Sequence, residues 1–261
     1  LVLIPGFGLR PLVKTLTAAL TLVAISLYLA ITGFEISATR SYVMLALVLL
    51  AILFHREPKP MRSIALAALL MLALDPSDIT EPGFQLSFAA TLALIAAFEN
   101  IFDETLQERG PIATLWRIVW FLLLTTIVAQ AATTTIILFH FNNLSLYGIF
   151  SNLILTPVVT LLIMPMVACY FVLLPFGLDP IALHILSYGI KAMLWVAHEV
   201  SGWPHALTYT RGPTALGMAL AMLGLCWVCL WQTRTRRYGV IAILLGTATL
   251  FTVTPPDIFV S

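Results

Sequence analysis

Charged residues are scarce in this sequence. Lys, Arg, Asp and Glu make up 10% of the 261 residues, whereas a soluble globular domain carries about 25%. Hydrophobic residues make up 61%. This amount of charge is too small to cover a water-exposed surface. The composition therefore excludes an ordinary soluble fold and predicts that lipid surrounds most of the protein. The net charge of +1 indicates no strongly acidic or basic partner.

Cysteine is also rare. The three cysteines, Cys169, Cys226 and Cys229, all lie within apolar runs. An odd number inside apolar segments excludes a disulfide framework. Cys226 and Cys229 form a CxxC pair, but a zinc or redox site needs a second ligand pair or a βαβ context. The pattern favours two small buried residues on one helix.

Familiar catalytic motifs are absent. The sequence has no P-loop, no HExxH and no GxSxG, and its five histidines show no metal-ligand spacing. We therefore expect no enzymatic activity, no cofactor and no metal. The chain begins at Leu1 without a signal peptide and ends soon after Pro255-Pro256-Asp257, so we expect it to be part of a longer protein.

Apolar runs occur nine times along the chain. A spanning helix needs about 20 apolar residues, and charged or Pro/Gly-rich breaks separate the runs. This pattern predicts an all-α, polytopic transmembrane bundle that forms one domain over residues 1–261. The third run is short for a full crossing, and the sixth contains Pro157 and Pro165, so it is either one kinked helix or two pieces. The nine runs are approximately Leu16–Phe34, Ser41–Phe54, Arg62–Leu74, Gly83–Phe98, Leu115–Phe139, Tyr147–Leu174, Pro180–Val200, Pro213–Gln232 and Tyr238–Val253.

The basic residues predict an orientation. With nine crossings and a cytoplasmic N-terminus, ten Lys and Arg residues flank the spans inside and two flank them outside, as the positive-inside rule requires. The C-terminus then lies outside. The inside residues are Arg10, Lys14, Arg56, Lys59, Arg62, Arg109, Arg117, Arg234, Arg236 and Arg237, and the outside ones are Arg40 and Arg211.

Polar residues inside the seventh run share one helical face. His184, Ser187, Lys191 and His198 follow offsets of 0, 3, 7 and 14, and Trp195 lies beside them. Polar residues within spans are costly in lipid. The face either borders an aqueous path or consists of a snorkelling lysine and histidines that bind neighbouring carbonyls.

A second polar face lies on the fifth run. It combines Gln130 with Thr126, Thr133 and Thr134. These side chains either line a pore or form hydrogen bonds between helices. In the eighth run, Gly217, Ala221 and Gly224 form a small-residue face typical of close helix packing.

Arg40 follows Gly33 and Ser37 near the start of the second run. If Ser37 caps this helix, its free N–H groups and Arg40 form an anion site on the outer face. The alternative is an ordinary flanking arginine.

Three ordered segments resemble the competence domain of ComEC-type DNA uptake proteins. They are Tyr28-x4-Gly33-x3-Ser37-x2-Arg40, then Asp75-Pro76 with Gly83-Phe-Gln-Leu-Ser-Phe-Ala-Ala90, and Asn152-x4-Pro157. The resemblance extends from about Leu16 to Trp231. It implies a channel in the bacterial cytoplasmic (inner) membrane that imports single-stranded DNA during natural transformation. It implies competence-machinery proteins as partners and leaves a homo-oligomer open. Members usually also have an OB-like and a metallo-β-lactamase-like domain, which this sequence lacks, as it lacks the family's segment before the first span.

The resemblance and the polar spans together give candidate residues. A moving strand must not be held tightly, so few cations and many neutral donors suit its passage. The stacking candidates Tyr28, Tyr42 and Trp195 are equally compatible with an interfacial aromatic belt. A secondary transporter for a small solute is the rival, favoured by the two prolines of the sixth run but lacking related halves. The pore-lining or DNA-contact candidates are Arg40, Gln85, Ser87, Gln130, Asn152 and Lys191, and the structural motif residues are Gly33, Ser37 and Pro157.

Overall fold

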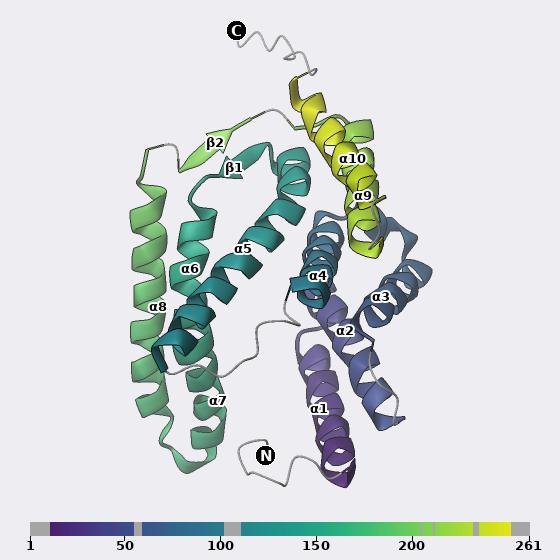
Figure 1. Ribbon diagram of the computed structural model, residues 1–261. Coiled ribbons are helices and arrows are strands. Elements are labelled where there is room, and N and C mark those ends of the chain that lie inside the picture. The colour runs from purple at the N-terminus through teal and green to yellow at the C-terminus, as the bar shows by residue number, and fades with distance from the viewer. Residues whose placement is uncertain are drawn as a thin grey trace, which may run out of the picture.

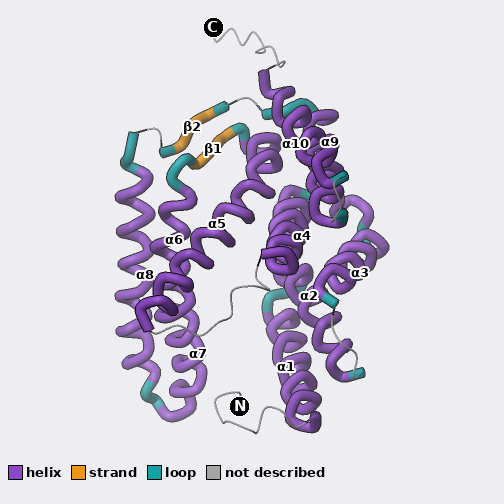
Figure 2. Tube along the Cα trace, in the orientation of Figure 1, coloured by secondary structure: helices purple, strands orange, loops and turns teal. Residues whose placement is uncertain are grey.

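The computed structural model describes residues 11–54, 59–101, 111–204, 206–210, 212–231 and 235–251. These residues are mostly helical (Figures 1 and 2). The α-helices are α1 (Pro11–Ile31), α2 (Ile36–Leu53), α3 (Pro60–Leu74), α4 (Pro82–Ile101), α5 (Pro111–Phe141), α6 (Gly148–Val158), α7 (Met164–Leu173), α8 (Asp179–Ser201), α9 (Ala215–Leu230) and α10 (Arg236–Ala248). Short helical turns are η1 (Pro76–Thr80), η2 (Val159–Ile163), η3 (Leu174–Phe176) and η4 (Thr249–Phe251), and the strands are β1 (Asn143–Ser145) and β2 (Leu207–Tyr209).

The all-α prediction is confirmed, and each of the nine apolar runs contains a helix. By length and composition, four helical segments suffice to cross a membrane: Val13–Ile31, Val119–Phe141, Gly148–Phe176 and Asp179–Ser201. Others are apolar but shorter. The 15 residues of α3 extend about 22 Å, less than the roughly 30 Å of a hydrocarbon core. Nine crossings therefore stay a prediction, as does the orientation, part of whose charge count (Arg10, Arg56, Arg109, Arg211 and Arg234) lies outside the described residues.

The sixth run is one continuous helical segment, Gly148–Phe176. Pro157 lies inside α6, and the π-helical turn η2 begins two residues later. Proline has no N–H and its ring crowds the preceding turn, so a widened π turn accommodates the disturbed hydrogen bonding without ending the helix.

The helices form two groups joined by α5 (Figure 1). One group contains α1–α4 with the α9–α10 pair, and the other contains α6, α7 and α8. The main core lies between α2, α3 and α4, and α4 also packs against α5 and α9. Helix α4 is therefore the central element of the first group. The three core clusters are Val43, Ile64, Ala67, Met71, Phe84 and Phe88; Ala89, Ile136 and Met218; and Ala93, Ala96 and Cys229.

Helices α9 and α10 pack closely through glycines. A Cβ atom on Gly239 would lie 2.7 Å from the carbonyl oxygen of Gly224, and the converse distance is also 2.7 Å. Such contacts allow no side chain larger than hydrogen. The predicted packing role of Gly217, Ala221 and Gly224 is confirmed, since all three are buried on α9.

A two-stranded antiparallel sheet joins the connection between α5 and α6 to the segment between α8 and α9. Asn143 pairs with Tyr209 and Ser145 with Leu207. Asn142 adopts a positive φ of 54°, and its Oδ1 accepts a hydrogen bond from the Gly212 N–H. These strands were not predicted from the sequence.

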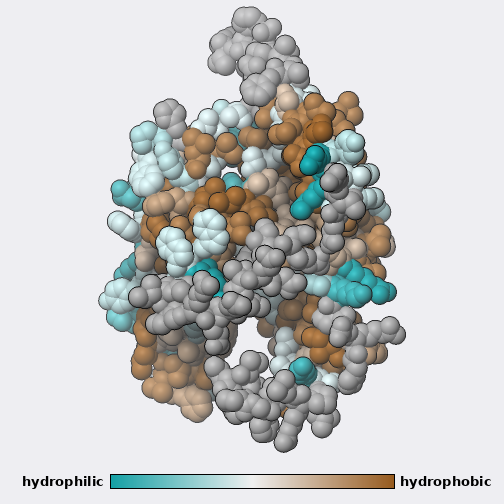
Figure 3. All heavy atoms as spheres, viewed as in Figure 1, coloured by the Kyte–Doolittle hydropathy of each residue, from teal (hydrophilic) through white to brown (hydrophobic). Residues whose placement is uncertain are grey.

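The surface carries large apolar side chains over much of the face shown in Figure 3. Ile31 is 84% exposed and Leu216 is 78% exposed. Patches of this extent are not typical of water-soluble monomers, and they fit a protein whose helices meet lipid. The lower part of this face is hollowed between the two helix groups (Figure 3).

Candidate functional site

Arg40 lies on α2 and packs against the first turn of α4. Its side chain is buried, and a Cβ atom built on Gly83 would lie 2.9 Å from both Nη1 and Nη2. The guanidinium thus occupies the space that the glycine leaves open. The sequence placed Arg40 near the start of its own helix, α2. In the structure its side chain also contacts the start of a second helix, α4, at Gly83.

The guanidinium is incompletely bonded. Arg40 Nε is buried and has no hydrogen-bond partner. The acidic segment before α4 does not compensate for it, because the Asp75 carboxylate accepts hydrogen bonds from the Ser77 N–H and Oγ at 2.9 and 2.6 Å. Those bonds, that from the hydroxyl above all, lower the pKa of Asp75.

A pocket of about 200 Å³ lies beside Thr39, the residue before Arg40. Two carboxylates, those of Asp75 and Asp78, contribute to its wall. Their negative charge makes this pocket unsuitable for an anion. The remaining lining residues are Phe34, Met71 and Leu74.

Gln85 connects three elements through its side-chain amide. Nε2 donates to the carbonyl oxygen of Ile79 in η1 at 2.8 Å, and Oε1 lies 2.8 Å from His140 Nε2 at the end of α5. Both ends of the amide are thus engaged. Gln85 holds α4, η1 and α5 together at one end of the bundle, and its role as a DNA contact stays a prediction.

Three further polar candidates lie on α4, α5 and α6. Ser87 is half-buried on α4, and Asn152 is exposed on α6. Gln130 is half-buried on α5, where its Oε1 would lie 3.6 Å from a Cβ on Gly148. Gln130 therefore lies near the start of α6, on the side where the small sheet forms.

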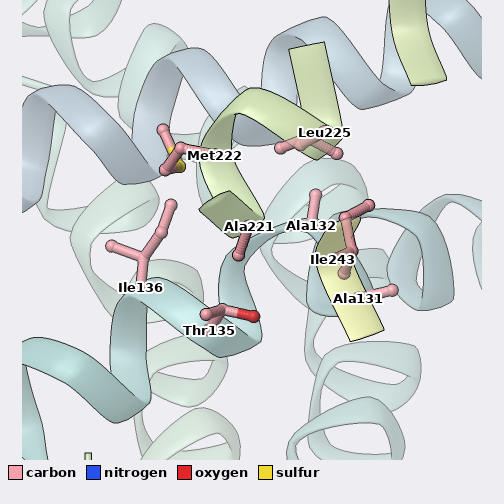
Figure 4. Close-up of a pocket in the computed structure, with 8 residues that line it drawn as sticks. All are labelled: Ala131, Ala132, Thr135, Ile136, Ala221, Met222, Leu225 and Ile243. Atoms are coloured by element: carbon pink, nitrogen blue, oxygen red, sulfur yellow. The ribbon is translucent and has the colours of Figure 1, made fainter. Parts of the chain in front are cut away.

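The threonines near Gln130 bond to their own helix. Thr133 Oγ1 donates to Ala129 O at 2.8 Å, and Thr134 Oγ1 donates to Gln130 O at 2.6 Å. Thr135 is buried and lines a cavity of about 20 Å³ between α5, α9 and α10, with Ile136, Ala221 and Ile243 (Figure 4). Its lining is almost wholly apolar, so the cavity is a packing defect rather than a ligand site.

The polar face of α8 is exposed. Lys191 and His184 lie on this side, with Tyr188 59% exposed and Trp195 66% exposed. Lys191 Nζ lies 5.6 Å from the centre of the Tyr188 ring, and the His184 ring meets the same tyrosine edge-on. Aromatic rings and the Lys191 cation thus share one accessible face.

The opposite face of α8 packs against the π-helical turn. Ala182, Gly189 and Val200 are buried there, and a Cβ on Gly189 would approach Leu162 and Ile163 to 3.1 Å. At 100° per residue, the polar stripe points about 160° away from these residues. The stripe therefore does not face the helices of its own group.

The motif residues have distinct structural roles. Gly33, with φ of +67°, ends α1, and the bonds from Gly33 N to Ala30 O and from Phe34 N to Leu29 O form a Schellman motif. Ser37 lies inside α2 and not at its N-cap position, so the condition for the predicted anion site at this helix start is not met. The chain enters the helix directly after this turn, so α2 begins at Ile36 and Glu35 takes the N-cap position without a side-chain bond.

The aromatic candidates occupy different environments. Tyr28 is 62% exposed on α1, whereas Tyr42 is half-buried and its hydroxyl lies 3.1 Å from Ser26 Oγ. Tyr42 therefore links α1 to α2. Within the described part of the chain, no hydrogen bond or ion pair joins any two of the six lining candidates, so they do not form one compact site.

The sequence profile of the family described as "Competence protein" matches residues 1–235. The chain belongs to the competence protein family. ComE operon protein 3 of Bacillus subtilis (strain 168) is 27% identical over 146 residues, which cover 56% of this chain and 17% of that protein. This competence protein therefore matches less than a fifth of its curated relative's length. No solved structure matches it significantly.

Three contacts in this competence protein were not predicted from its sequence. His140 had no metal-like spacing, and nothing indicated that it would meet Gln85, which is 55 positions away. Gly83 follows Pro82 at a helix start, which marks a boundary but not a partner for Arg40. The pairing of β1 with β2 involves three-residue strands, too short to give an alternating pattern.

Proposed function

We propose that this competence protein forms part of the wall of a membrane passage that imports single-stranded DNA into the bacterial cytoplasm during natural transformation. The family match over residues 1–235, most of the chain, carries this proposal. Its role is that of a conduit rather than an enzyme, and its partners are single-stranded DNA and competence-machinery proteins.

The exposed stripe on α8 is the best candidate for a part of the wall. Lys191 lies ten residues from the end of α8 at Ser201, a distance of about 15 Å along the helix. A lysine side chain does not reach that far, which disfavours snorkelling to an interface. A lysine at mid-span costs about 2.5–3.5 kcal/mol in lipid, so this face is more stable beside water or a further protein surface.

The composition of the stripe suits a single strand. Aromatic rings stack on bases of any sequence, and a few cations attract the backbone without holding it. Tyr188, Lys191 and Trp195 provide these groups on a face that the α6–α7 segment leaves uncovered. Another segment of the protein or a second copy closes the passage on that side.

Charge placement and helix contacts together support the predicted orientation. Arg40 meets Gly83, and Gln85 meets His140, so the starts of α2 and α4 and the end of α5 share one end of the bundle. The positive-inside rule assigns this end to the outer side and the N-terminus to the cytoplasm. Arg40 and Gln85 then lie where DNA enters.

Site-specific photocrosslinking to DNA in transit tests the α8 wall. A photoreactive residue replaces Lys191 in one variant and Ile190 in the other, and the incoming DNA carries a bulky end group that stalls it. Ile190 is 39% exposed and lies at the same depth along α8, but it points about 100° around the helix from Lys191, so it is the matched control. We expect crosslinks to DNA from position 191 and not from 190. Equal crosslinking, or none from position 191, would argue against this wall.

A transporter for a small solute is the second candidate. The π-helical turn after Pro157 favours it, because interrupted helices often form solute sites. Gradient-driven uptake of a solute by proteoliposomes, with normal DNA entry in cells lacking the gene, would support this candidate over the first.

A further inference from the structure

Arg40 retains a buried donor that nothing in the described part of the chain satisfies. The side chain is 8% exposed, and its Nε has no hydrogen-bond partner. Most buried polar atoms in proteins are bonded, so an orphaned one calls for a missing partner. A guanidinium has five N–H donors and no acceptor, so that partner must supply an acceptor.

Two helix starts meet at Arg40. The residue lies in the second turn of α2 and contacts the first turn of α4 at Gly83. The first bond within α4 runs from Gln85 N to Glu81 O, so the N–H groups of Gly83 and Phe84 precede the helical ladder. Helix starts carry partial positive charge, and a cation there is stable only if an anion balances it.

The protein supplies no such anion among its described residues. The Asp75 carboxylate accepts hydrogen bonds from the Ser77 N–H and hydroxyl. No carboxylate among the described residues forms an ion pair with Arg40. The Glu35 side chain at the start of α2 makes no capping bond. The guanidinium therefore has no carboxylate partner among the described residues.

We propose that Arg40 and the first turn of α4 bind one phosphate oxyanion. A guanidinium edge and helix N-terminal amides are the groups that recognise phosphate. The phosphodiester backbone of the incoming strand is its source, and this assignment rests on the proposed function. A phospholipid headgroup offers the same chemistry, so the experiment separates the two sources.

Gly83 sets the position of this guanidinium. A methyl group at residue 83 would lie 2.9 Å from both Nη atoms, so Gly83→Ala displaces the charge without removing it. Arg40→Gln removes the charge. Arg62 lies in the first turn of α3 and is exposed, so Arg62→Gln is a matched control that removes an equal charge from a different helix start.

The experiment measures binding to the full-length protein in a phosphate-free detergent. The probes are fluorescent (dT)20, an uncharged peptide nucleic acid of the same sequence, and the thermal shift produced by phosphatidylglycerol or by an uncharged glycolipid. We expect Arg40→Gln and Gly83→Ala to weaken (dT)20 binding about tenfold, the loss expected for a charge-assisted hydrogen bond. The salt slope of log K should fall by about 0.7, the value for one phosphate contact on a single strand.

The controls make the outcomes distinct. Arg62→Gln should bind as the wild type does, and the peptide nucleic acid should not distinguish any variant. If Arg40→Gln and Gly83→Ala lose only the thermal shift with phosphatidylglycerol, the site binds a lipid phosphate. The assignment to the DNA backbone is then refuted, whether or not the protein imports DNA. Unchanged affinity and slope for every phosphate probe in a folded Gly83→Ala variant would overturn the site, even where Arg40→Gln does not fold.

Discussion

At the scale of single residues, Gln85 shows how one amide fixes a junction. It donates to Ile79 O and approaches His140 Nε2, both at 2.8 Å, and so joins three elements. The hydrogen bonds of a half-buried amide add stability mainly because breaking them leaves partners unsatisfied. The junction keeps the start of α4, and with it the Arg40 contact, in place.

Replacing Gln85 tests this structural role. We expect Gln85→Leu to destabilise the protein by about 1–3 kcal/mol, because His140 and the Ile79 carbonyl lose their partner. Ser87→Ala on the same helix is the control, and a loss within about 0.5 kcal/mol is expected for it. Thermal unfolding in detergent compares the two. Equal unfolding temperatures for wild type and Gln85→Leu would contradict the junction.

Residue types were easier to predict than residue partners. The sequence singled out Arg40 as an anion-binding candidate because a cation followed a helix start. It could not indicate that the relevant helix start belongs to α4, 43 positions further along at Gly83, because that contact depends on how α2 and α4 pack. For the same reason, His140 was not expected beside Gln85.

At the scale of elements, the apolar runs and their polar breaks predicted the helices well. The α9–α10 pair shows why this worked, because small residues at helical spacing allow two helices to pack closely. The π turn was less predictable. Pro157 indicated that the hydrogen bonding of the helix is disturbed, but a kink, a break or a widened turn can each accommodate a proline. In the structure the turn is a widened π turn, and it packs against Gly189 of α8.

The α9–α10 contact yields a prediction about glycine. Gly239→Ala places a methyl group 2.7 Å from the Gly224 carbonyl oxygen, which is backbone and cannot turn aside. We expect a loss of about 1–3 kcal/mol from overpacking. Gly202→Ala is the control, because its nearest neighbour would be 3.4 Å away. Thermal unfolding measures both, and a Gly239→Ala protein as stable as Gly202→Ala would refute the close contact.

At the scale of the whole molecule, composition established the membrane class, but crossing number needs more than hydropathy. Four helical segments are long enough to span, while the apolar stretches Ala38–Leu53, Pro60–Leu74, Pro82–Phe98 and Ala215–Leu230 are shorter. Short helices cross only when packing or a locally thin bilayer accommodates them. The sequence therefore predicted where helices lie better than how each one meets lipid.

Reporter fusions test the predicted topology. Alkaline phosphatase is active outside the cytoplasm and green fluorescent protein mainly inside it. We expect phosphatase activity for fusions between α5 and α6 and at the C-terminus, and fluorescence for fusions between α7 and α8, because charge placement assigns those ends to opposite sides. The reverse pattern would contradict the orientation, and activity of the same reporter between α5 and α6 and between α7 and α8 would contradict a crossing by the segment Gly148–Phe176.

Entry of labelled DNA into a naturally transformable host tests the central claim most directly. Cells with and without the full-length gene receive DNA labelled along both strands, and label at the surface is separated from nuclease-protected label in the cytoplasm. The proposed passage predicts that deletion leaves surface binding in place, reduces internal single-stranded label to background, and is reversed by the restored gene. Internal label at the wild-type level in the deletion strain would contradict a role for this protein in DNA import.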